Sequence, residues 1–139
     1  MSTDNLINGL NEDLSAELGT IIRYNYQAGK STGFMGTEMR KMFSGELKDE
    51  MRHARFLTDV ISDMGGEPVT KPKNFEKPDS IKDMLELDLM MEEKDVKNYR
   101  KHSSQAEELG LMELKVKLEE IAADEASHAR KIRRILKGI

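Results

Sequence analysis

The chain repeats its own pattern once. Residues 1–64 and 76–139 align without gaps at an offset of 75, and 12 of the 64 aligned pairs are identical. Roughly four identities would be expected from this composition by chance. The repeat predicts two copies of one structural unit, related by a pseudo-two-fold axis.

Apolar residues in both halves recur at alternating steps of four and three, as on the buried face of a helix. Four stretches carry this pattern, at about residues 3–30, 37–64, 80–108 and 111–137. The breaks between the first and second stretches and between the third and fourth are short, so these helices should be antiparallel neighbours. The pattern therefore predicts an all-α fold of two antiparallel helical hairpins.

The stretch that joins the two hairpins, residues 65–78, contains all three prolines and no helical pattern. Fourteen residues of extended chain can span roughly 46 Å, and a helix of 28 residues is about 42 Å long. The stretch can therefore run the length of a helix as one long crossover. We expect residues 1–139 to form a single domain, a four-helix bundle with this crossover.

Composition excludes several classes of site and partner. The chain has no cysteine, so disulfides and cysteine-held zinc or iron–sulfur clusters are excluded. No run reaches the roughly 18 apolar residues of a membrane span, and the N-terminus does not resemble a signal peptide. A formal net charge of −4 argues against nucleic acid as a partner. We therefore expect a cytoplasmic protein.

Glutamates stand on the predicted buried faces, where an apolar residue would be expected. Glu50 and His53 lie three residues apart, so both side chains point to one spot. The repeat places a second Glu-x-x-His pair on the fourth helix and one more glutamate on each remaining helix. A single pair of this kind is usually a surface ion pair, but the matched set is the ligand set of a di-iron site. The predicted metal ligands are Glu17, Glu50, His53, Glu92, Glu125 and His128.

Other polar residues near these positions have two readings each. Tyr24 and Tyr99 follow the lone glutamates by seven residues, and their hydroxyls either bond to the ligand carboxylates or serve packing alone. Asp49 and Asp124 either orient a histidine of the opposite hairpin or are solvated helix acids. His102, whose repeat counterpart is a glutamine, is expected to be exposed.

With these motifs the chain resembles the ferritin-like di-iron carboxylate proteins, above all the bacterioferritins. The resemblance implies that the six ligands form a ferroxidase centre, with Glu50 and Glu125 bridging two iron ions and Glu17 and Glu92 capping them. The paired tyrosines are similar to those of rubrerythrins. The rubrerythrin glutamate three residues after the third-helix ligand is, however, Asp95 in this chain.

The resemblance implies a cytoplasmic iron-handling oxidoreductase with a role in iron homeostasis and oxidative stress. Its substrates would be Fe(II) and O2 or H2O2, and it would bind two iron ions per chain, with Mn(II) or Zn(II) as substitutes. Three alternatives stay open: a rubrerythrin-like peroxide reductase, an iron-binding or storage module with little turnover, and a structural bundle whose metal is incidental.

The resemblance also bears on haem and on assembly. In bacterioferritins, the methionine at the position of Met51 ligates a haem between two subunits; otherwise Met51 is an ordinary exposed methionine. Leu18 and Ile22 would offer apolar neighbours, and such a strip usually marks an interface. The chain ends 11 residues after His128, short of the fifth helix that helps to close the bacterioferritin shell. We therefore expect a homodimer or a small homo-oligomer.

Overall fold

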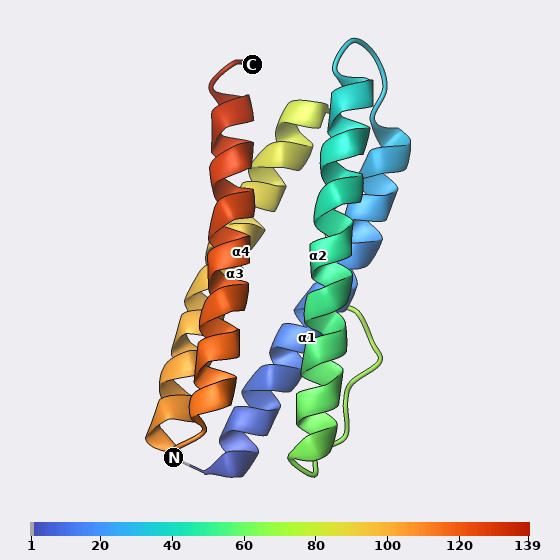
Figure 1. Ribbon diagram of the computed structural model, residues 1–139. Helices are drawn as coiled ribbons and strands as arrows, with labels where there is room; N and C mark the ends of the chain where they lie inside the picture. The colour runs from blue at the N-terminus through green and yellow to red at the C-terminus, as the bar shows by residue number, and fades with distance from the viewer. Residues whose placement is uncertain (1) are drawn as a thin grey trace. The chain divides into compact units, whose positions relative to one another are not determined.

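The computed structural model describes residues 2–139, which form four long helices and no strand (Figure 1). The helices are α1 (Thr3–Lys30), α2 (Gly36–Asp63), α3 (Ile81–Glu108) and α4 (Met112–Leu136). The predicted all-α class is confirmed. No helix in the described part of the chain is long and apolar enough to cross a membrane.

The helices divide between two compact units. The first, Leu14–Glu76, contains most of α1, all of α2 and the connection that follows α2. The second joins the residues up to Asp13 to Lys77–Ile139, and thus contains the first turns of α1 with α3 and α4. Each unit contains one antiparallel helical hairpin (Figure 1).

In the first unit, α1 and α2 pack through aromatic and aliphatic side chains. The rings of Tyr24 and Phe43 lie 5.5 Å apart between their centroids, and both side chains are fully buried. Helix α2 ends in a Schellman motif: Gly65 adopts φ 83°, and the Gly66 amide donates to the Ile61 carbonyl at 2.9 Å. Because glycine adopts a positive φ without steric cost, the chain turns sharply into the connection at this point.

The connection is held against α1 by backbone contacts. Lys73 N–H donates to the Ser15 carbonyl at 3.0 Å, and the Ser15 hydroxyl donates to the Lys71 carbonyl at 2.8 Å. A Cβ atom on Gly19 would lie only 2.7 Å from the Lys73 carbonyl oxygen. The connection therefore needs a residue without a side chain at position 19 of α1.

In the second unit, α3 and α4 pack against each other, and Leu6 and Leu10 from the first turns of α1 are buried in the same unit. Helix α3 begins at an N-cap, where the Ser80 hydroxyl accepts from the Asp83 amide at 3.1 Å. It ends in a second Schellman motif, built on Gly110 at φ 75°. This motif makes the tight turn that sends α4 back along α3.

His102 lies in this core, and the expectation that it is exposed is wrong. Its side chain is only 5% exposed, and its Nδ1 lies 2.6 Å from a carboxylate oxygen of Asp13, which is also buried. A Cβ atom on Gly9 would lie 2.6 Å from its Nε2. The ring therefore fits against α1 only because residue 9 is glycine.

We expect Gly19→Ala to lower the free energy of unfolding, although alanine is the better helix former by about 1 kcal/mol. The new methyl group would force the connection away from α1. Gly45→Ala is the matched control, because a Cβ at that position in α2 would meet nothing within 4 Å. It should raise the free energy of unfolding by roughly 0.5–1 kcal/mol. Urea denaturation measures both, and stabilisation by Gly19→Ala would contradict the account of the connection.

Candidate metal centre

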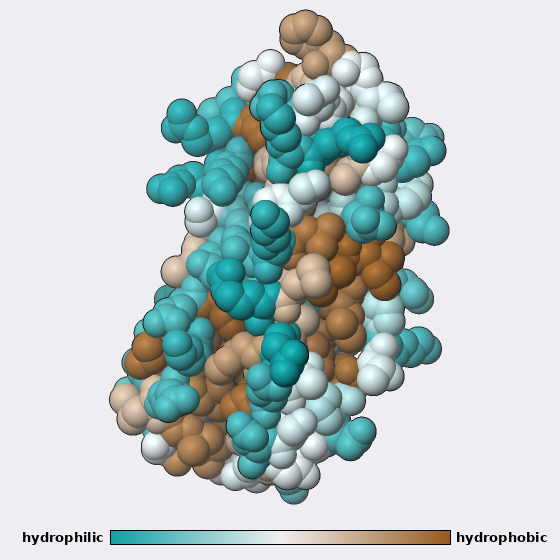
Figure 2. All heavy atoms as spheres, turned by 45° about the vertical axis from the view of Figure 1, so that its right-hand side comes forward, coloured by the Kyte–Doolittle hydropathy of each residue, from teal (hydrophilic) through white to brown (hydrophobic). Residues whose placement is uncertain are grey.

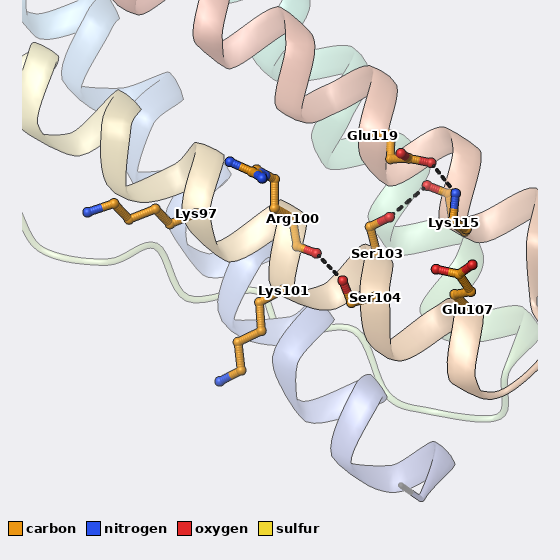
Figure 3. A pocket seen from close by; sticks show the side chains of 8 residues that line it. All are labelled: Lys97, Arg100, Lys101, Ser103, Ser104, Glu107, Lys115 and Glu119. Atoms are coloured by element: carbon orange, nitrogen blue, oxygen red, sulfur yellow. Dashed lines mark hydrogen bonds and ion pairs between the residues drawn. The ribbon is translucent and has the colours of Figure 1, made fainter.

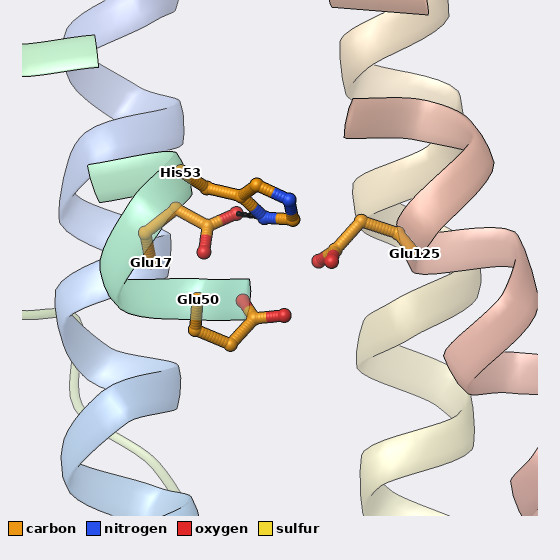
Figure 4. Close-up of side chains that lie close together, drawn as sticks. All are labelled: Glu17, Glu50, His53 and Glu125. Atoms are coloured by element: carbon orange, nitrogen blue, oxygen red, sulfur yellow. Dashed lines mark ion pairs between the residues drawn. The ribbon is translucent and has the colours of Figure 1, made fainter. Parts of the chain in front are cut away.

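In the α1–α2 unit, three predicted ligands converge. Glu17 comes from the middle of α1, and Glu50 and His53 lie one turn apart on α2. One ligand atom from each of the three lies within 4.8 Å of the others, and none of the three residues is more than 2% exposed. Figure 4 shows the carboxylates and the imidazole of this group turned toward one another.

The α3–α4 unit holds the matching group. Glu92 comes from α3, and Glu125 and His128 lie one turn apart on α4. Their ligand atoms also lie within 4.8 Å of one another, and the three residues are at most 1% exposed. The internal repeat of the sequence is therefore a repeat of this buried Glu-Glu-His geometry.

The spacing within each group fits a bound divalent cation. His53 Nδ1 lies 3.7 Å from Glu17 Oε1, and His128 Nδ1 lies 3.5 Å from Glu92 Oε1 and 3.4 Å from Glu125 Oε1. These separations exceed a hydrogen bond of about 3 Å. Two ligands that each lie about 2.1 Å from one metal ion stand roughly 3–4 Å apart. Oxygen and imidazole ligands without thiolate suit iron, manganese and zinc.

Burial makes these groups costly when no cation is bound. Carboxylates removed from water lose hydration, and two of them in one small volume repel each other. A divalent cation offsets both costs at once. Each group is therefore a site that can couple metal binding to the stability of the fold.

The other residues predicted near the ligands differ in their burial. Tyr24 and Tyr99 are buried, at 0% and 1% exposure, so both face the interior as expected. The Asp49 carboxylate accepts from Arg52 at 3.0 Å, and Asp124 is half-buried. The roles of these residues toward the ligand carboxylates and histidines stay predictions. Met51 is 56% exposed.

Several charged residues that were not predicted to be buried lie in the interior. Arg23 is fully buried, with its guanidinium carbon 5.1 Å from the centroid of the Tyr24 ring. Glu46, Asp13 and Asp88 are also buried. The internal repeat points to Asp13 and Asp88 as interior residues, because the two aspartates align with each other and are identical. Arg23 and Glu46 have no identical partner.

The model of the ferritin-like domain family matches residues 7–139, nearly the whole chain. Among curated proteins, no sequence matches this chain.

Several solved structures are similar to this chain. A ferritin-like, diiron-carboxylate protein from Bacillus anthracis is 38% identical, with a TM-score of 0.94 over 98% of this chain and 99% of that one. The Mycobacterium tuberculosis bacterioferritin BfrA is 26% identical, with a TM-score of 0.90 over 99% and 87% of the two chains. The bacterioferritin of Desulfovibrio desulfuricans, at 24% identity and a TM-score of 0.83 over 96% and 79%, shares the fold. These likenesses confirm the predicted four-helix fold class with one long crossover.

We expect Glu92→Ala to remove the metal ion of the α3–α4 group, because it deletes one of three converging ligands. The number of ions bound per chain should fall from two to one in anaerobic equilibrium dialysis with Fe(II). The metal-free variant should melt at least as high as the metal-free wild type, since one buried carboxylate is gone. Glu93→Ala, which changes the exposed neighbouring glutamate, is the control and should keep both ions. Full binding by Glu92→Ala would remove Glu92 from the ligand set.

Proposed function

Since the chain belongs to the ferritin-like domain family, we propose that it is a di-iron carboxylate protein that oxidises Fe(II) with O2 or H2O2. The pair of buried Glu-Glu-His groups carries this proposal. The two groups match in residue types, in helical spacing and in the 33 residues that separate the first glutamate from the second. A chance cluster of surface acids would show none of these matches.

We infer that both groups belong to one two-metal centre. Support comes from the printed description of the Bacillus anthracis protein as a diiron-carboxylate protein, at 38% identity over nearly the whole of both chains. The family resemblance assigns bridging positions to Glu50 and Glu125 and capping positions to Glu17 and Glu92. His53 and His128 would supply one imidazole nitrogen to each ion.

The ligand set suits the oxidation of iron. Each bound Fe(II) supplies one electron to the oxidant. The four glutamates carry four negative charges in a buried volume, and their field favours the higher charge of Fe(III) over that of Fe(II). The Nδ1 atoms of the two histidines lie 3.7 Å from Glu17 Oε1 and 3.5 Å from Glu92 Oε1. Tyr24 and Tyr99 would orient ligand carboxylates through their hydroxyls.

Two other functions are compatible with the same ligands. A rubrerythrin-like peroxide reductase would use the centre with peroxide in preference to O2, and a storage module would bind iron with little turnover. We favour the ferroxidase because the six proposed ligands resemble the ferroxidase-centre ligands of bacterioferritins, and the Mycobacterium tuberculosis bacterioferritin is 26% identical over 99% of this chain.

Stopped-flow absorbance tests the function. Mixing the protein and Fe(II) with O2 or H2O2 should give Fe(III) absorbance faster than free Fe(II) does. Glu50→Ala should slow this phase by at least about tenfold, because loss of a ligand weakens metal binding and misplaces the iron. Glu93→Ala should react as the wild type does. Rapid reaction with H2O2 alone would favour the peroxide reductase, and binding without accelerated oxidation would favour storage.

We also propose that the outer face of α1 and α2 is covered by a second copy of the chain. Ile22 and Met51 are 47% and 56% exposed, and Leu18 lies one turn before Ile22. On the face drawn in Figure 2, hydrophobic side chains gather in patches between hydrophilic ones. An apolar strip of this kind is favourable when a partner removes it from water.

The double variant Ile22→Lys with Met51→Lys should be monomeric where the wild type is a homodimer, because four lysines would face one another across the interface. Met90→Lys, at an exposed methionine of α3, is the control and should stay dimeric. Sedimentation velocity measures both. A monomeric wild type would remove the interface, and a dimer without a haem Soret band after reconstitution would leave Met51 a packing residue.

A further inference from the structure

A groove that is open to solvent runs along the outer side of the α3–α4 hairpin. It consists of two adjoining hollows of about 490 and 280 Å³, both lined by Lys97 and Arg100. Figure 3 shows the larger hollow, where these side chains and Lys101 lie along α3 and Lys115 lies on α4. We call these two hollows together the α3–α4 groove.

The acidic residues at the two ends of the groove are occupied by their own cations. At one end Lys115 Nζ lies 2.8 Å from Glu119 Oε1, and this hydrogen bond raises the pKa of Lys115. At the other end Arg133 lies 3.9 Å from Glu93. Glu107 also lines the larger hollow. The two hollows together are lined by five cations and three carboxylates, and two of these carboxylates are paired within the groove.

The cations at the centre of the groove remain unpaired. In the described part of the chain, Lys97, Arg100 and Lys101 form no ion pair, and all three are exposed. In a protein with a formal net charge of −4, three neighbouring unpaired cations concentrate positive potential at one place. Concave surfaces strengthen such a potential because their low-dielectric walls focus the field.

The internal repeat shows how this face differs from its counterpart. At an offset of 75, Lys97 corresponds to Ile22 and Ala126 to Met51. The large apolar side chains of the α1–α2 face are thus replaced by a cation and by a small side chain that leaves a hollow. Both hairpins keep the same buried Glu-Glu-His group, while these two positions of the outer face differ.

The groove lies behind the α3–α4 metal ligands. Glu93, Ala126 and Ala129 line its smaller hollow, and each is the sequence neighbour of a ligand on the same helix. Adjacent residues point about 100° apart on a helix, so the groove and the ligands lie on different sides of the hairpin. The five cations that line the groove outnumber its three carboxylates, so its net charge disfavours Fe(II) and favours an anion.

We propose that the α3–α4 groove binds a phosphate-type oxyanion, free or as a phosphate monoester, between Arg100 and Lys97. A guanidinium can hold two phosphate oxygens at once through parallel N–H donors, and a lysine adds a mobile point charge. The groove is open to solvent, so an ester substituent has room to leave it. An acidic protein segment is the competing occupant, and the hollow shape favours the small anion.

Isothermal titration calorimetry of the iron-loaded chain with inorganic phosphate, at constant ionic strength, tests the proposal. The double variant Lys97→Gln with Arg100→Gln should bind phosphate at least about tenfold more weakly, the change expected from loss of a charge-assisted hydrogen bond. Lys131→Gln with Arg134→Gln removes the same two charges from exposed positions of α4 outside the groove. This control should bind as the wild type does. Phosphate that binds to iron contributes equally in all three proteins.

Titration with phenyl phosphate distinguishes the two sources of the anion. Tighter binding than inorganic phosphate assigns a monoester, and weaker binding assigns the free ion. Equal phosphate affinity in the wild type and the groove variant would overturn the proposal, as would the absence of saturable binding. A hexaglutamate peptide that binds the groove and is not displaced by phosphate would also overturn it, and would assign an acidic segment instead.

Discussion

In each helical unit, two glutamate carboxylates and one imidazole lie together on buried helix faces, with ligand atoms within 4.8 Å of one another. Burying these carboxylates costs free energy, because they lose hydration and repel each other. The hairpins must therefore be rigid enough to keep them there without metal, and long helices with continuous apolar contacts provide that rigidity. The buried Glu-Glu-His group thus depends on the apolar contacts between the helices that hold it in place.

The connection after α2 contributes to this rigidity at a specific place. Its contacts with α1 involve Ser15 and Gly19, the residues two positions before and two positions after Glu17. Residues two apart on a helix point about 200° apart, so the connection braces the side of α1 opposite to the Glu17 carboxylate. A change that dislodges the connection should thus disturb the metal ligand as well as the fold.

The two hairpins also show how an internal repeat can separate functions. Inside, Glu50 corresponds to Glu125 and His53 to His128, because two similar metal positions require the same donors. Outside, Ile22 corresponds to Lys97, because the two faces meet different surroundings. The α1–α2 face exposes Ile22 and Met51, and the corresponding α3–α4 face has a hollow lined by Lys97 and Arg100.

The sequence alone determined the helical class, the presence of a repeat and the identity of the matched glutamates and histidines. These features are readable because helical periodicity is local, and because the repeat supplies an internal comparison at every position. It did not reveal that His102 is buried, since the ring lies against Asp13 and Gly9, more than 80 residues away in the chain. Nor did it reveal the α3–α4 groove. A lone histidine and an exposed lysine carry no periodic signal, and only the packing of distant segments decides whether a polar side chain is paired, buried or left facing a hollow.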